Sequence, residues 1–148
     1  MVKDLSPGMD YLERIRRMGR EANPFFCLMG IEVESLGKGE AALRMTARQD
    51  MMNGEGWLQG GIFTALADEA MVLAIYTLLS SGESIATITE STTFIAGSRE
   101  ATLFAVGKVI KKGRRVAFAE GEVRTGEPGG DLLSRSTAAF VVRRDHQS

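Results

Sequence analysis

Histidine and cysteine are almost absent from this sequence. The one histidine, His146, is third from the end, and the one cysteine, Cys27, has no second cysteine with which to form an internal disulfide. A histidine-activated nucleophile, as in serine and cysteine triads, therefore has no base in the body of the chain. The spacing of a zinc site is also missing, so we expect no metal. A lone cysteine fits a reducing compartment, and we expect the protein to be cytoplasmic.

A strong charge bias is missing as well. Lys and Arg total 18 and Asp and Glu total 19, which gives a formal net charge of -1 at pH 7 and no reason to expect nucleic acid as a partner. The N-terminal residues lack the apolar stretch of a secretion signal. The most apolar run, residues 62–79, carries Asp68 and Glu69 near its middle, where ionised side chains are costly in a bilayer. We therefore expect no membrane association.

The length of 148 residues suits one compact domain. Apolar periodicity predicts a short amphipathic helix, a strand hairpin, a long helix and then four further strands. The expected ranges are 9–20, 31–36 with 40–47, 58–79, 84–96, 101–112, 114–125 and 132–144. Pro24 follows the first helix, which it cannot continue. Strands with helices to one side indicate the α+β class.

The long helix is apolar on all sides, and its alanines keep it slim. A helix of this kind is buried, so we expect the sheet to wrap around it. Gly60 and Gly61 lie at its start, and Asp68 and Glu69 interrupt its apolar middle. Two adjacent acids in a buried helix require an explanation. They either line a functional cleft or form a structural pair satisfied by an arginine.

A spaced pattern surrounds the start of this helix. It consists of Asn53, Gly56, Gly60, Gly61 and the run Leu66–Asp68. The segments "TFIAGS", "VIKKGRRVAFAEGEVR" and "LLSRSTAAFVV" follow it in order. Together these features resemble the hotdog-fold thioesterases, in particular the phenylacetate-pathway and acyl-CoA thioesterase branch. The resemblance covers residues 25 to 143 and divides the chain into an N-terminal helical segment, 1–24, and a hotdog domain, 25–148.

The resemblance implies a fold and a reaction. The fold is an antiparallel sheet wrapped around a long central helix. The reaction is hydrolysis of an acyl-CoA thioester at a site between two subunits, so we expect a homodimer or a dimer of dimers. Coenzyme A is then part of the substrate, and no separate cofactor is expected.

Thioester hydrolysis needs a polarised carbonyl and an activated water or nucleophile. Free N–H groups at the positive end of a helix can polarise the carbonyl, and Gly60 and Gly61 lie at that end. A carboxylate can serve as general base or as nucleophile, and the family spacing favours Asp68 for that role. Glu69 points about 100° away around the helix, so it cannot share the role.

Three further positions take roles through the resemblance. Asn53 would orient the thioester or the water, and Thr87, in the strand after the helix, would hold the water. Gln59 stands where the family has a histidine before the glycine pair. Glutamine forms hydrogen bonds but does not shuttle protons near neutral pH. We expect it to remain beside the carbonyl as a hydrogen-bonding group.

A basic turn, "KKGRR", follows further along the chain. Lys112, Arg114 and Arg115 are suited to the phosphates of coenzyme A. The same residues also fit a solvated turn. The other candidates also have structural explanations. Asn53 is a common turn residue, Thr87 is a residue typical of strands, and the glycine pair can form a tight turn that has no function.

Two other functions remain open at this stage. The chain fits a non-catalytic acyl-CoA-binding or regulatory module on the same fold, which Gln59 in place of histidine would explain. The hydratase branch of the fold uses a histidine with an acid, and no histidine lies in the core region of this chain.

Overall fold

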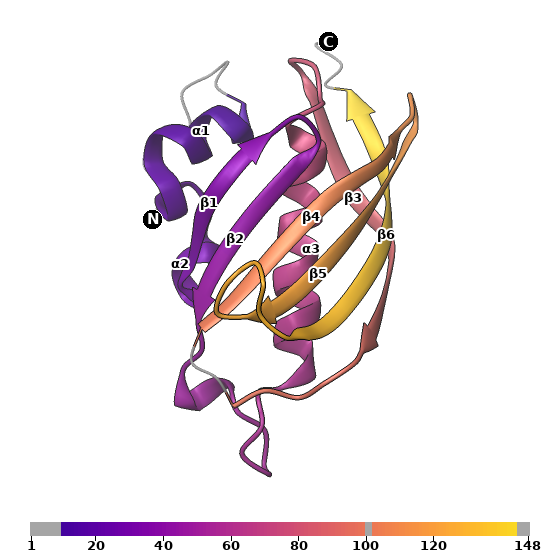
Figure 1. The fold of residues 1–148 in the computed structure, drawn as a ribbon. Coiled ribbons are helices and arrows are strands. Elements are labelled where there is room, and N and C mark those ends of the chain that lie inside the picture. Colours follow the sequence, from indigo (N-terminus) through magenta and orange to yellow (C-terminus); the bar gives the residue numbers. More distant parts are fainter. Residues whose placement is uncertain (1–9, 100–101, 145–148) are drawn as a thin grey trace.

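The computed structural model describes residues 10–99 and 102–144. Over this part of the chain, six antiparallel strands form one sheet that packs on the long helix α3, Gly60–Tyr76 (Figure 1). The strands lie in the order β1-β2-β4-β5-β6-β3. Their bounds are β1 Ile31–Gly37, β2 Glu40–Thr46, β3 Glu83–Phe94, β4 Thr102–Lys112, β5 Val116–Thr125 and β6 Leu132–Arg144. The predicted sheet around one long helix is confirmed.

The N-terminal segment folds into three short helices. They are α1 (Tyr11–Met18), the 3-10 helix η1 (Gly19–Ala22) and α2 (Pro24–Met29). The side chain of Asp10 caps α1 by accepting a hydrogen bond from the Glu13 N–H at 2.8 Å. Ile15 of α1 is buried in the same cluster as α3 and the sheet. The described part of the predicted segment 1–24 thus packs on the domain, whereas Met9 lies outside the described residues.

Pro24 begins a helix that the sequence did not predict. It stands at the first position of α2, where proline's missing N–H costs no hydrogen bond. Asn23 caps this helix, and its side chain accepts a hydrogen bond from the Phe25 N–H at 2.9 Å. Reading Pro24 only as a helix breaker was therefore incomplete.

Helix α3 is shorter at both ends than the predicted range 58–79. Before it, the Leu58 N–H donates to the Ser98 carbonyl at 2.9 Å, so Leu58 is held by a loop instead of a helical turn. Thr77 follows the last helical residue, and its hydroxyl donates to the Ala74 carbonyl at 2.6 Å. The same hydroxyl accepts from the Gly39 N–H at 2.8 Å, which ties the helix end to the β1–β2 turn.

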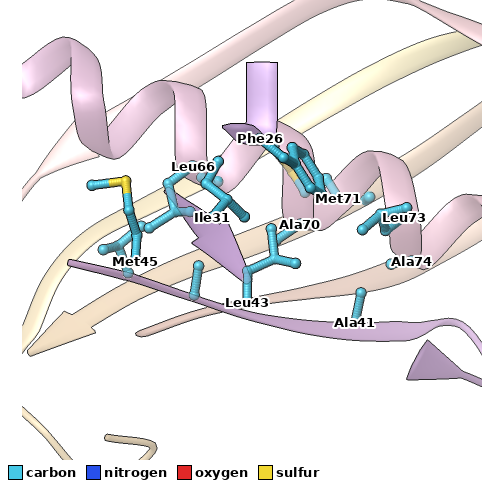
Figure 2. Packing of buried hydrophobic residues seen from close by; sticks show 14 of the residues in the cluster. Phe26, Ile31, Ala41, Leu43, Met45, Leu66, Ala70, Met71, Leu73 and Ala74 are labelled. Atoms are coloured by element: carbon cyan, nitrogen blue, oxygen red, sulfur yellow. The ribbon is translucent and has the colours of Figure 1, made fainter. Parts of the chain in front are cut away.

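The core lies between α3, the sheet and the N-terminal helices. Figure 2 shows Phe26 of α2 and Leu43 of β2 gathered against Met71 of α3. All three side chains are inaccessible to solvent. Full burial of such a side chain stabilises the fold by about 1.5–3 kcal/mol. This packing fixes the position of α3 relative to the sheet.

One side of α3 is less covered than the sequence led us to expect. The side against the sheet is buried, including Leu66, Ala67 and Ala70. The other side holds Asp68 and Glu69, which are half-buried. Burial on all sides is thus not reached within one chain. No helix in the described ranges is long and apolar enough to cross a membrane.

Strand β3 forms one edge of the sheet and pairs only with β6 among the described strands. Its register with β6 shifts between Thr87 and Thr89, which marks a β-bulge. The bulged residue Ile88 is 57% exposed. A bulge adds one residue to a strand and reverses the alternation of faces beyond it. Thr87 and Glu90, three positions apart, therefore reach the same face.

Candidate active site

Asp68 lies halfway along α3, where the helix faces strand β3. Its carboxyl group interacts with the side chains of Thr87 and Glu90 on that strand. One of its two carboxyl oxygens, Oδ1, is buried and has no hydrogen-bond partner among the described residues. Burial raises the pKa of Asp68 above its ordinary value, while Glu90 and Thr87 act in the opposite direction. One carboxyl oxygen is therefore unsatisfied in a partly dehydrated position.

Glu90 is a site residue that the sequence did not predict. Its carboxyl group forms a side-chain hydrogen bond with Asp68, and its Oε2 accepts from the Thr92 hydroxyl at 3.3 Å. Burial raises the pKa of Glu90 to about 7, and the charge of Asp68 contributes to the rise. A strict two-residue alternation from Thr87 would have placed Glu90 on the opposite face of β3. Only the bulge brings it to Asp68.

Thr92 connects the carboxyl pair to its surroundings. Its hydroxyl also lies 2.9 Å from the Ser136 hydroxyl on β6, which is buried. The Thr64 hydroxyl on α3 donates to Thr92 at 3.3 Å. Hydroxyl groups on α3, β3 and β6 thus form a connected set that ends at Glu90.

Glu69 is the third acid of this region. Burial raises its pKa to about 7, and the charge of Asp68 adds to the effect. Burial of the Tyr11 ring on α1 is the main cause that raises the pKa of Tyr11 to about 12, and the negative charge of Glu69 adds to this effect. Glu69 therefore faces the N-terminal helices, whereas Asp68 faces β3. The two acids thus have different surroundings, and their different roles remain a prediction.

The glycine turn lies at the beginning of α3. Gln59 precedes the helix as its N-cap residue, is exposed, and makes no side-chain capping hydrogen bond. The first-turn N–H groups of a helix have no partner within the helix. A Cβ atom on Gly60 would stand 3.2 Å from the Phe94 ring, whereas a Cβ atom on Gly61 would meet open space. The turn is thus open to an approaching ligand at Gly61.

Asn53 organises the loop before this turn. Its Oδ1 accepts hydrogen bonds from the N–H groups of Glu55 at 2.9 Å and Trp57 at 3.1 Å. Gly56, within this loop, has a φ of +84°, which favours glycine. Asn53 is exposed and acts as a turn residue in one chain. A contact between Asn53 and a substrate remains a prediction.

The basic hairpin lies at the opposite end of α3 from the glycine turn (Figure 1). Lys112 is already engaged, because its Nζ lies 3.3 Å from Oε1 of the buried Glu83. Arg114 and Arg115, between β4 and β5, are exposed. The structure therefore does not bring these three residues to the glycine turn of their own chain.

A different cation lies beside the glycine turn. The Arg99 guanidinium stacks on the Trp57 ring at 4.0 Å from its centroid, and a Cβ atom on Gly97 would stand 3.0 Å from the same ring. Both side chains are exposed. Arg99 could not be predicted from the sequence, because the loop after β3 folds back toward this turn only in three dimensions.

No three His, Cys, Asp or Glu side chains within residues 10–99 and 102–144 are arranged to hold a metal ion. The groups that the site does present are carboxyl groups, hydroxyl groups and a helix N-terminus. An available carboxylate oxygen beside a threonine hydroxyl can orient and deprotonate a water molecule. A helix N-terminus can stabilise a developing oxyanion.

Comparison with known proteins shows solved structures with a similar fold. A thioesterase family protein from Silicibacter pomeroyi is 19% identical with a TM-score of 0.83, covering 92% of this chain and 100% of that chain. A thioesterase from Haemophilus influenzae is 21% identical with a TM-score of 0.79, covering 95% and 96%. A mutant of the phenylacetic acid degradation protein PaaI from Thermus thermophilus is 25% identical with a TM-score of 0.71, covering 80% and 98%. No curated protein matches the chain.

The α+β hotdog fold predicted from the sequence is confirmed by these likenesses and by the sheet around α3. A family model for the thioesterase superfamily matches residues 55–131, which begin before the glycine turn and end before β6. The match includes Asp68, Thr87 and Glu90 and covers more than half of the sequence. The chain therefore belongs to the thioesterase superfamily.

Proposed function

We propose that this protein hydrolyses acyl-CoA thioesters, with Asp68 as the general base. The observation that carries the proposal is the position of its carboxyl group. Oδ1 is buried without a hydrogen-bond partner among the described residues, and the Thr87 side chain lies beside the same carboxyl. A partly dehydrated carboxylate with a raised pKa is a stronger base than one in water.

The reaction has two steps. A water molecule held by Thr87 attacks the thioester carbonyl carbon and gives its proton to Asp68, which forms a tetrahedral oxyanion. The N–H groups at Gly60 and Gly61 stabilise that oxyanion. The C–S bond then breaks, and the proton passes to the coenzyme A thiolate. This last transfer leaves Asp68 ionised again. The products are free coenzyme A and a carboxylic acid, which loses its own proton to the solvent.

The geometry favours a site shared by two copies of the chain. Asp68 follows Gly60 by eight positions, which places it about 12 Å along the helix from its own glycine turn. Strand β3, which carries Thr87 and Glu90, is a sheet edge open to a second copy. Pairing two β3 edges would bring the Asp68 region of one protomer toward the glycine turn of its partner. We propose a homodimer or a dimer of dimers.

The remaining predicted residues take supporting roles in this proposal. Gln59 and Asn53, at the open side of the glycine turn, would orient the thioester. Arg114 and Arg115, with Lys112 beside them, would contact coenzyme A phosphates across the assembly. Coenzyme A serves as part of the substrate, and the proposal includes no separate cofactor.

The test is a panel of acyl-CoA thioesters in which the released thiol is detected. We expect wild-type protein to turn over at least one member, and Asp68→Asn to lower kcat by about 100-fold or more, the usual size of such losses. Glu69→Gln is the matched control, since it neutralises the adjacent acid on another side of α3, and it should retain turnover. Full turnover by a folded Asp68→Asn variant would disprove the role of Asp68.

The same panel tests the second candidate, a non-catalytic acyl-CoA-binding module. The observation that favours this candidate is Gln59 at the exposed N-cap, where proton transfer is not available. Binding of acyl-CoA by calorimetry without thiol release from any member would support the module and overturn the enzyme proposal.

A further inference from the structure

We infer that Glu90 is a positioning residue for Asp68: it keeps a proton, donates it in a hydrogen bond to the Asp68 carboxylate, and thereby holds that carboxylate toward the attacking water. The inference rests on the proposed function for its catalytic meaning. The proton shared by the two side chains is a property of the folded protein alone.

Hydrogen-bond chemistry gives the first argument. The carboxyl groups of Asp68 and Glu90 form a side-chain hydrogen bond. An ionised carboxylate has no donor, so two carboxyl groups bonded to each other must hold at least one proton between them. Two ionised carboxylates in direct contact would repel each other in a partly dehydrated site. The pair therefore binds one proton in its bonded form.

The surroundings decide which residue keeps the proton. Asp68 receives support from two side chains, Thr87 and Glu90, both of which favour its ionised form. Glu90 receives one hydrogen bond that favours its ionised form, from the Thr92 hydroxyl at 3.3 Å, whereas burial and the charge of Asp68 raise its pKa to about 7. When the pair holds one proton, Asp68 is therefore the carboxylate and Glu90 the carboxylic acid.

Few other groups face Glu90. Its cross-strand neighbour on β6 is Ala138, which has no charge. From α3 it meets Asp68, and along its own strand it meets Thr92. Glu69 also titrates near pH 7, but its neighbours are Asp68 and Tyr11, so it acts on Glu90 only through Asp68. Among the described residues, Asp68 is thus the charged group that controls Glu90.

Loss of the Glu90 proton should reduce catalysis. Once both groups are ionised, the hydrogen bond that orients Asp68 is replaced by repulsion. The added negative charge also opposes the oxyanion that forms in the reaction. The wild-type kcat/KM should therefore fall as the pH rises through about 7, the pKa of Glu90.

Two variants separate the proton of Glu90 from its bulk. Glu90→Gln keeps the shape and a donor that cannot ionise, so it should retain most of the kcat at pH 6 and lose the alkaline decline. Glu90→Ala removes the donor and should lower kcat by about 10- to 100-fold with little change in KM. Glu69→Gln is the control that neutralises the other acid and should keep the decline.

Three outcomes would overturn the inference in an active enzyme. They are an alkaline decline retained by Glu90→Gln, a decline abolished by Glu69→Gln, and equal loss of kcat at all pH values in folded Glu90→Gln and Glu90→Ala. Circular dichroism establishes folding of each variant.

A second readout needs no turnover. Carbon-13 NMR of protein labelled at the glutamate carboxyl should show Glu90, assigned by the loss of its signal in Glu90→Gln, titrating near pH 7 in wild type. Asp68→Asn removes the negative charge beside Glu90 and should therefore lower the pKa of Glu90. An ordinary titration of Glu90 in wild type would overturn the inference. If Glu90 titrates near pH 7 as expected but no thioester is hydrolysed, only the proposed function would be overturned.

Discussion

Gly107 of β4 lies directly against the backbone of Ala70 in α3. A Cβ atom on Gly107 would stand 2.3 Å from the Ala70 carbonyl oxygen, far inside contact distance. On the neighbouring strand, a Cβ atom on Gly121 would stand 3.2 Å from Cγ of Met71. Small residues on both elements thus let the helix approach the sheet closely, which sets the distance between Asp68 and the strands.

We predict that Gly107→Ala destabilises the protein by about 1–3 kcal/mol or more, because the obstacle is backbone and cannot rotate away. Gly129→Ala is the matched control: no atom lies within 4 Å of a Cβ at that position, and its backbone requires no glycine. Urea denaturation measures both. Equal stability of the two variants would show that α3 can shift at no cost.

A buried ion pair provides a pH-dependent prediction. Glu83 is buried, accepts from the Ser80 N–H at 2.8 Å, and lies 3.1 Å from Nη2 of Arg144 and 3.3 Å from Nζ of Lys112. The Ser80 hydrogen bond first, and then the two cations, lower the pKa of Glu83 below its ordinary value. Because the pKa of Glu83 is lower in the folded than in the unfolded protein, its ionised form stabilises the fold at pH values above the unfolded-state pKa of this residue. This stabilisation is lost as the pH falls through the folded-state pKa of Glu83.

Glu83→Gln should therefore cost about 1–3 kcal/mol of unfolding free energy at pH 7. The difference from wild type should shrink below about pH 4.3, the ordinary value for glutamate. Glu122→Gln is the control, since Glu122 pairs with Arg124 and Arg135 at a more exposed position and should cost less. Equal losses at pH 7, or a loss from Glu83→Gln that does not depend on pH, would contradict the assignment.

The sequence predicted the elements of this fold more fully than the site. Periodicity and turn residues were sufficient for α3 and the strands. The interaction of the Asp68 carboxyl group with Thr87 was not predicted as a contact, although both residues were named as site residues. Glu90 was missed because nothing in "ATITESTT" marks the bulge at Ile88, and without the bulge Glu90 would face away from Asp68. A bulge is set by pairing with β6, which a local pattern does not contain.

The positions of the basic side chains likewise could not be predicted from the sequence. "KKGRR" is visible as a run, but folding assigns Lys112 to Glu83 and places the turn beyond the far end of α3 (Figure 1). Arg99, a lone arginine in a loop, reaches the glycine turn because the chain after β3 returns past Trp57. Such contacts depend on tertiary structure and have no local signature.

The different positions of Arg99 and of the β4–β5 hairpin lead to different predictions for substrate binding. Arg99 is next to the glycine turn, so Arg99→Ala should raise KM for acyl-CoA several-fold with little change in kcat. The double variant Arg114→Ala with Arg115→Ala should raise KM for acyl-CoA only if the oligomer places the β4–β5 hairpin beside a phosphate of the bound coenzyme A. A short thioester without the nucleotide is the control substrate, and its KM should not change. Unchanged KM for acyl-CoA in Arg99→Ala would exclude Arg99 from binding.

The open edge of β3 gives the prediction on which the shared site depends. Thr89 and Ser91 are exposed on this strand, which carries no lysine or proline along its 12 residues. Lysine and proline are two of the features that keep natural sheet edges unpaired, so this strand lacks two of the barriers to pairing with a second copy. Two strands related by a two-fold axis bring identical positions near each other, so new positive charges there would repel their counterparts.

The double variant Thr89→Lys with Ser91→Lys should therefore be monomeric by light scattering and should lose thioester hydrolysis together with dimerisation. Ser35→Lys, at an exposed position on the opposite edge strand β1, should leave the oligomeric state and activity unchanged. A monomeric double variant with full turnover would show that one chain holds a complete site. Wild-type protein that is monomeric at assay concentration and active would lead to the same conclusion, because Asp68 would then act without the glycine turn of a partner.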